Sequence, residues 1–302
     1  QIIADLTDAE QYAPDNDNSD RTKMTKTVAQ AMLAKVYAEK EVQDYDKVIA
    51  YADKVMKTTG VELEDSYETL WGYDETAKDC MKRNTKEGIL EVHWTTGSGN
   101  WETWMYGRQL DNWDYYFTWA KWITPSRDII NDFDKEGDEV RKNQAIVYYA
   151  CTWSNYYPAS NYPFMYKLRS SYNNIYWLRL ADIILMKAEA EAYKGNLAES
   201  AKLVNQIRKR AKLKELTSDK TGSKESMIEA VLHERRLELA FEGERWFDLC
   251  RNNKVEQYLN GIDNRDSGRI RQVRQFDGNS YLLPIPQTAL DQNTNLEQNP
   301  GY

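Results

Sequence analysis

The sequence predicts a mainly α-helical protein of stacked helix pairs with a loop-rich aromatic insertion. Apolar residues recur at helical spacing in residues 1–85 and again in residues 177–302. Residues 86–176, in contrast, carry most of the tryptophans and several Gly-rich turn signals, with little helical periodicity. We therefore expect a helical part over 1–85, a ligand-binding part over 86–176 and a second helical part over 177–302, folded together as a single structural domain in a chain of 302 residues.

The first helical part contains two apolar stripes separated by a short polar break. Ala29, Leu33 and Tyr37 recur every four residues, which places them on one helical face. The second stripe runs through residues 48–55, and Gly60 follows it at a position suited to the left-handed residue after a helix. This pattern predicts an antiparallel helix pair within residues 21–60.

The second helical part repeats this pattern. Leu180, Ile184 and Ala188 lie one turn apart, Gly195 interrupts the helix, and a new stripe begins at Ala201. A third stripe, from about Ser226, is interrupted at Gly243. We expect antiparallel pairs within residues 178–213 and 225–258. Their Ala-rich seams are typical of tetratricopeptide units, with a generic helical hairpin as the alternative.

The middle part contains shorter elements. Residues 89–94 are predicted as a strand or an extended segment, and residues 95–100 as a Gly/Ser/Thr turn. Residues 123–133 predict a short helix, with Pro125 near its first turn and Thr124 or Ser126 as its cap.

Composition excludes several functional classes. The formal net charge of -8 argues against a general nucleic-acid binder, which needs a basic face. No run approaches the roughly 18 apolar residues of a membrane-spanning helix. Two histidines and three scattered cysteines supply neither a His-rich zinc site nor a disulfide framework. We expect no metal and no cofactor.

The aromatic composition points to a ligand. Trp and Tyr, with 10 and 21 residues, far outnumber the six Phe. These two side chains combine a flat apolar ring with a polar edge, and they cluster within residues 101–122 among Asn, Asp, Glu and Arg. A sugar ring has an apolar C–H face and hydroxyl edges, so it is recognised by such rings beside amide, carboxylate and guanidinium groups.

We predict a platform for an oligosaccharide on this basis. The alternative is that the rings only pack the loops against the helices. We expect at least half of the rings in 101–122 to have this packing role. A second aromatic segment lies within residues 153–162, where the two interpretations stand equal. The predicted stacking residues are Trp101, Trp104, Trp113, Trp153 and Tyr156, and the predicted hydroxyl partners are Asn100, Arg108, Asp111 and Asn155.

Three charged clusters have a structural and a functional interpretation. Residues 234–248 are dense in Glu, Arg and Asp, which we interpret as a network that fixes the last helices to the body rather than as a carboxylate site. Residues 15–18 and 263–266 carry enough Asp and Asn oxygens for a calcium ion, but they lack EF-hand spacing, and a solvated loop is the preferred interpretation.

The C-terminal part resembles the SusD/RagB family. The resemblance is carried by residues 179–192 (RLADIILMKAEAEA), 204–208 (VNQIR) and 234–249 (ERRLELAFEGERWFDL), followed by 283–286 (LPIP) and 299–302 (NPGY). These elements occur in the family's order. Residues 21–37 also resemble the helix that opens the second half of the family's fold, so the resemblance covers almost the whole chain.

The resemblance implies a function at the cell surface. Members are outer-membrane lipoproteins of Bacteroidota that bind glycans or other nutrients and deliver them to a SusC-like, TonB-dependent transporter, without being enzymes. They are typically longer, so the resemblance implies that the N-terminal part, with its lipid anchor, is absent from this chain. Two alternatives stay open: a glycoside hydrolase with carboxylates near Glu102, Asp111 and Asp114, and a protein-interaction scaffold whose aromatics contact protein.

Overall fold

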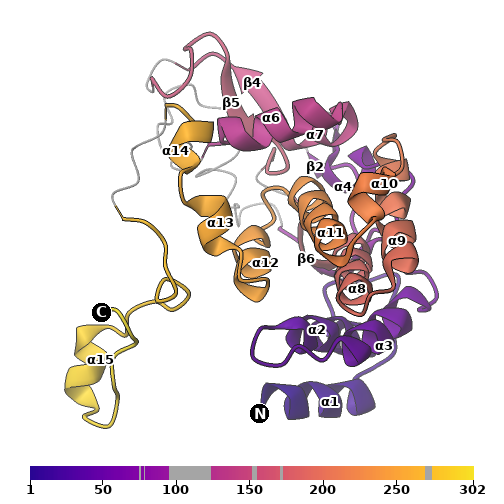
Figure 1. Ribbon diagram of the computed structural model, residues 1–302. Coiled ribbons are helices and arrows are strands. Elements are labelled where there is room, and N and C mark those ends of the chain that lie inside the picture. The colour runs from indigo at the N-terminus through magenta and orange to yellow at the C-terminus, as the bar shows by residue number, and fades with distance from the viewer. Residues whose placement is uncertain (75, 78, 95–123, 152–154, 171–172, 269–273) are drawn as a thin grey trace.

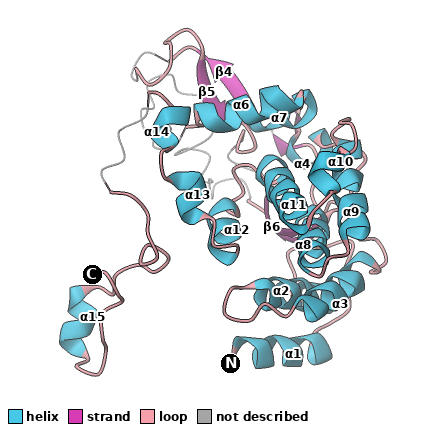
Figure 2. Ribbon diagram, viewed as in Figure 1, coloured by secondary structure: helices cyan, strands magenta, loops and turns pink. Residues whose placement is uncertain are grey.

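The computed structural model describes all of the chain except residues 75, 78, 95–123, 152–154, 171–172 and 269–273. The described part is mainly helical, as Figure 2 shows, so the predicted fold class is confirmed. In chain order the helices are α1 (Ile2–Tyr12), α2 (Lys26–Ala38), α3 (Tyr45–Met56), α4 (Glu68–Trp71), α6 (Arg127–Glu136), α7 (Glu139–Ala145), α8 (Leu180–Tyr193), α9 (Leu197–Arg210), α10 (Ser218–Thr221), α11 (Lys224–Glu238), α12 (Arg245–Arg251), α13 (Val255–Leu259), α14 (Ile262–Arg265) and α15 (Gln287–Gln292).

The strands form three short antiparallel pairs among the described residues. They are β1 (Tyr73–Asp74) with β2 (Asp79–Cys80), β3 (Gly88–Val92) with β6 (Ile175–Arg179), and β4 (Ile146–Tyr149) with β5 (Tyr162–Met165). The β3–β6 pair contains register shifts between Gly88 and Glu91, and it leads directly into α8. The extended segment predicted at residues 89–94 is therefore the strand β3.

Two of the predicted helix pairs are present as α2–α3 and α8–α9. Side chains cap the first pair: Thr25 accepts a hydrogen bond from the amide of Val28, and Asp44 accepts one from the amide of Lys47. The rings of Tyr45 and Tyr193 stack with centroids 4.6 Å apart, so residues at the turns of the two pairs meet. Figure 1 shows α1, α2 and α3 stacked below α8.

Two expectations about helix ends need correction. Gly60 does have a positive φ of 78°, but α3 ends at Met56 with Lys57 as its C-cap, so Gly60 belongs to the following turn. Residues 225–258 do not form a simple pair of long helices. The long helix α11 is followed by two short ones, α12 and α13, because Phe241 and Gly243 adopt positive φ between α11 and α12 and a polar turn separates α12 from α13.

Helix α8 is the centre of the core. Every residue from Leu180 to Ala192 is buried, and its apolar side chains pack with α2, α3, α9 and α11. The alanines at 181, 188 and 192 are fully buried, which permits close contact between helices. Because α8 is covered on every side, its charged residues are buried as well and require partners.

The charged segment 234–248 forms buried ion pairs with several other elements, so its structural interpretation is confirmed. Glu238 is fully buried and pairs with Arg141 on α7, with Arg179 at the start of α8 and with Arg210 on α9. Arg179 also contacts Glu87 at 2.8 Å and Glu242 at 2.6 Å. These partners of Glu238 all lie on elements other than α11. The network therefore joins segments that are far apart in the sequence.

A second group of buried ion pairs joins α8 to α11, α12 and α2. Arg235 contacts Asp182 at 2.7 Å and Asp248 at 2.9 Å. Arg251 contacts Glu189 at 2.8 Å, and Lys35 contacts Asp182 at 2.9 Å. The short helix α12 is thus fixed by charges at its polar positions, while Phe247 on the same helix is exposed.

The first prediction concerns Glu238. Burial alone would raise the pKa of this carboxyl, but Arg210, Arg179 and Arg141 outweigh burial and hold the pKa well below its ordinary value. Glu238→Gln keeps the volume and leaves three buried guanidinium groups short of a charge. We expect it to lower the free energy of unfolding by about 3–5 kcal/mol, measured by urea denaturation.

The matched control is Glu199→Gln. Glu199 forms an exposed pair with Lys202 at 3.2 Å, so its loss should change stability by no more than about 0.5 kcal/mol. If Glu238→Gln cost no more than the control, the network would not stabilise the fold.

Candidate ligand-binding site

Most of the predicted saccharide contacts lie outside the described residues. These are Asn100, Trp101, Trp104, Arg108, Asp111, Trp113 and Trp153, together with the carboxylates Glu102 and Asp114 of the hydrolase alternative. Two predicted contacts are described. Asn155 is exposed, and Tyr156 is half-buried beside the β4–β5 pair.

The described flanks of the two aromatic segments meet in space. Thr124, which follows the first segment, donates a hydrogen bond from its hydroxyl to the carbonyl of Pro163, at 2.9 Å. The Tyr157 hydroxyl donates to the carbonyl of Pro125, at 2.7 Å. The described residues that flank the two segments are therefore held side by side at the start of α6, although more than thirty positions separate them in the sequence.

Arg127, the first residue of α6, is the central residue where the flanks of the two aromatic segments meet. Its guanidinium lies 4.1 Å from the ring centroid of Tyr157 and 5.4 Å from that of Tyr156, and it donates to the carbonyl of Tyr156. An ion pair of 3.0 Å with Asp266 orients it. Burial raises the pKa of Tyr157, so the phenol stays protonated and remains a donor.

The short helix predicted at residues 123–133 is present further along the chain, as α6 from Arg127 to Glu136, and Pro125 lies before its cap. Ser126 rather than Thr124 is the cap, because its hydroxyl accepts from the amide of Ile129 at 3.2 Å. Thr124 uses its hydroxyl for the contact with β5 instead.

Tyr162, which belongs to the second aromatic segment, serves the core. It is 1% exposed and packs with Cys151 and Phe164, against which Tyr156 and Tyr157 lie. All four residues of β5 are buried, so side chains on both faces of this strand are covered. Tyr162 therefore cannot stack on a ligand from solvent.

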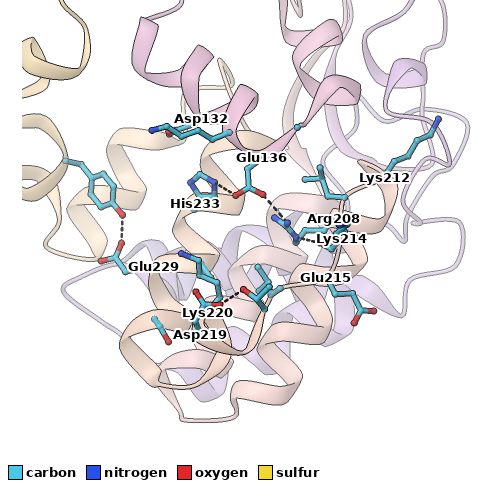
Figure 3. A pocket seen from close by; sticks show the side chains of 18 residues that line it. Asp132, Glu136, Arg208, Lys212, Lys214, Glu215, Asp219, Lys220, Glu229 and His233 are labelled. Atoms are coloured by element: carbon cyan, nitrogen blue, oxygen red, sulfur yellow. Dashed lines mark hydrogen bonds and ion pairs between the residues drawn. The ribbon is translucent and has the colours of Figure 1, made fainter.

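A cleft of about 930 Å³ lies between α6, α11 and the segment that connects α9 to α10. Figure 3 shows Glu136, His233 and Arg208 meeting on its wall. The Glu136 carboxylate contacts a guanidinium nitrogen of Arg208 at 3.0 Å and Nε2 of His233 at 3.2 Å. The hydrogen bond with His233 lowers the pKa of Glu136 to about 2, since it and Arg208 together outweigh partial burial.

No pattern in the sequence marks this cleft. Its wall comes from four segments whose residues have no common spacing. Charged positions at 132, 135 and 136 follow the ordinary polar face of an amphipathic helix, which is no signal of a site.

The two Asp/Asn clusters use their oxygens for protein contacts. Asn16 and Asn18 accept from the Arg21 guanidinium, Asp17 accepts from Ser19 and Lys23, and Asp266 accepts from Arg127. Over the described ranges, no three or more His, Cys, Asp or Glu side chains come together as a metal site. Within the same ranges no helix has the length and apolar character that crossing a bilayer requires.

The second prediction concerns the contact that holds the flanks of the two aromatic segments together. Tyr157→Phe removes the hydrogen bond to Pro125 and should lower the free energy of unfolding by about 0.5–1.5 kcal/mol, measured by urea denaturation. Tyr12→Phe is the control, because Tyr12 is 76% exposed on α1 and should tolerate the change. Equal effects of the two variants would mean that this contact does not hold the flanks together.

The third prediction concerns pH. Since folding lowers the pKa of Glu136 from 4.5 to about 2, its contribution to stability is present above pH 4.5 and is lost as the pH falls towards 2. The stability difference between the wild type and Glu136→Gln should therefore shrink over that interval, measured by denaturant titrations at each pH. A difference that stays constant would contradict the assigned contacts with Arg208 and His233.

The relatives of this chain agree on one family. The model of the SusD family matches residues 10–302. SusD-like protein P2 of Formosa agariphila is 27% identical over 344 residues, which cover 100% of this chain and 64% of the relative. SusD-like protein P38 of the same species is 36% identical over 135 residues, 43% of this chain and 25% of the relative. The chain thus spans less than two thirds of the length of these curated relatives.

Solved structures show the same fold. A SusD superfamily protein of Bacteroides vulgatus matches with a TM-score of 0.75 and 24% identity, covering 99% of this chain and 67% of that protein. A laminarin-binding SusD-like protein matches with a TM-score of 0.73 and 24% identity, covering 99% and 68%. Surface glycan-binding protein A of Bacteroides thetaiotaomicron, in complex with laminarihexaose, matches with a TM-score of 0.75 and 17% identity, covering 98% and 69%. The family model alone covers nearly the whole chain, and the chain belongs to the SusD family.

Proposed function

We propose that this protein binds an oligosaccharide or polysaccharide at the cell surface through aromatic residues of segments 101–122 and 153–162. The observation that carries the proposal is the meeting of the segments' described flanks, where Thr124 contacts Pro163 and Tyr157 contacts Pro125. Flat rings in both segments could then contribute to one platform. Two proteins with this fold are described as binding laminarin and laminarihexaose, which supports a saccharide as the ligand class.

The residues assigned to the platform are those that the sequence predicts. Trp101, Trp104, Trp113, Trp153 and Tyr156 provide stacking faces, and Asn100, Arg108, Asp111 and Asn155 contact hydroxyls. Among them Tyr156 is held in place, because the guanidinium of Arg127 lies over its ring and donates a hydrogen bond to its backbone carbonyl. A ring held from one side loses little conformational freedom when a sugar stacks on the other side.

The fourth prediction is the effect of removing single rings. Alanine at position 101, 104, 113, 153 or 156 should weaken saccharide binding by about 1–3 kcal/mol if base–aromatic stacking is a fair guide, which is roughly a 5- to 150-fold loss of affinity. The ligand is first identified on a glycan array, and affinities are then measured by calorimetry, with thermal unfolding as a check on the fold.

Trp177→Ala is the matched control. Trp177 is 65% exposed on β6 and lies outside both segments, so its removal should leave the affinity unchanged. If all five variants bind normally, the platform is elsewhere. If only the control loses affinity, the binding surface lies on β6.

Delivery to a transporter is the second part of the proposal. In the cell the protein is expected at the outer membrane, held by a lipid anchor, where it passes its ligand to a SusC-like, TonB-dependent transporter. Family membership supports this role. The full-length precursor, tagged and extracted from outer membranes, should co-purify with such a transporter, and recovery of intact protein without any transporter would contradict the role.

We also propose that the protein does not cleave its ligand. The competing assignment, a glycoside hydrolase using Glu102, Asp111 and Asp114, predicts shorter products after incubation with the bound saccharide. Chromatography of the saccharide before and after incubation distinguishes the two functions, and shortened products that disappear in an Asp111→Asn variant would favour the hydrolase.

A further inference from the structure

A second cleft adjoins the one in Figure 3. It has a volume of about 310 Å³ and shares Asp132, Lys135, His233 and Tyr258 with the larger cleft of about 930 Å³. Together they form one hollow bordered by α6, α9–α11 and α12–α14. Volumes of this order are those of pockets that hold small organic ligands.

When the side chains that already form ion pairs are set aside, the wall of this hollow carries more cationic groups than carboxylates. Asp132 is paired with Arg236, Glu136 with Arg208 and Glu229 with Lys254. Two carboxylates of the wall, Glu215 and Asp219, form no ion pair within 4 Å among the residues that the structure describes, although Lys220 lies near enough to Asp219 to help lower its pKa. In the same described part of the chain, five cationic side chains of the wall have no carboxylate within 4 Å, and these are Lys135, Lys212, Lys214, Lys220 and Arg245.

Arg245 shows that this excess is built into the fold. Its guanidinium is half-buried, lies 4.6 Å from the ring centroid of Tyr258 and donates to the carbonyl of Leu232. Burial and the neighbouring charge of Arg236 lower the pKa of Arg245, and together they outweigh Asp248 and Tyr258, which raise it. An anion in the hollow would relieve this repulsion.

The surplus positive charge contrasts with the whole molecule, whose formal net charge is -8. An acidic protein repels anions in general, so a local concentration of unpaired lysines around a concave surface selects them at one place.

We propose that this hollow binds the anionic group of an acidic saccharide, a uronate carboxylate or a sulfate ester. The inference rests on the proposed saccharide binding and narrows its ligand class. Lys135 on α6 and Lys220 on α10 border the hollow from two different elements, so both contribute to its field and both are exposed enough to reach an incoming anion.

The test uses three anionic probes and one neutral probe. Calorimetry at pH 7 measures binding of tri-galacturonate, of a sulfated galactan tetrasaccharide, of inorganic sulfate and of neutral laminarihexaose. The first two probes separate a carboxylate from a sulfate ester, and inorganic sulfate tests the charge without a sugar. At least one acidic saccharide should bind more tightly than laminarihexaose, and its affinity should fall as salt is raised, because salt screens the lysines.

The double variant Lys135→Gln/Lys220→Gln tests whether the hollow binds the anionic group. It should weaken binding of the preferred acidic saccharide by about tenfold or more, since it removes two charge-assisted contacts, and leave binding of neutral saccharides unchanged. The control is Lys57→Gln/Lys202→Gln, which makes the same change of charge at two exposed positions outside the hollow and should have little effect.

Three outcomes overturn the inference. They are absence of binding by all three anionic probes, equal affinity for acidic and neutral saccharides, and equal losses in the two double variants. Neutral saccharides that bind normally in any of these cases would leave the proposed function intact. Conversely, acidic saccharides that bind and depend on Lys135 and Lys220, while no aromatic variant matters, would support the hollow and contradict the aromatic platform.

Discussion

The fold depends on a set of charges buried between helices. Glu238 at the end of α11 meets arginines from α7, from the start of α8 and from α9, and Arg179 carries the contact on to Glu87 beside β3. Taking these groups out of water is costly, so they stabilise only the one arrangement in which every charge has its partner. The network thus fixes which elements are neighbours, while the apolar seam around α8 supplies most of the burial.

This scaffold places two different surfaces on the same body. At the start of α6, Arg127 and Tyr157 bring together the flanks of two segments rich in Trp and Tyr. Further along α6, the polar face of the same helix borders a hollow with unpaired lysines. In the proposed function, one helix therefore borders both the aromatic platform and the cationic hollow, a combination that suits ligands with both flat sugar rings and charged substituents.

Local patterns in the sequence predicted local structure well. The stripes through Ala29–Tyr37 and Leu180–Ala192 predicted α2 and α8, and Ser126 was one of two named caps of α6. Gly60 and the short helices after Gly243 were less predictable, because a helix end is also decided by tertiary contacts. The partners of Glu238 and the wall of the hollow depend on which elements become neighbours, and no spacing within one element contains that information.

Native-state hydrogen exchange tests the central role of the buried charges most directly. If the network joins α8 to α11, the slowest amides of the two helices should open at the same free energy, equal to that of global unfolding, although Arg179 and Glu238 lie 59 residues apart. Amides of α15, a helix with no buried residue, should exchange through much smaller openings. Opening of α11 at a free energy well below that of α8 would contradict the account, because the two helices would then not be held by a shared set of charges.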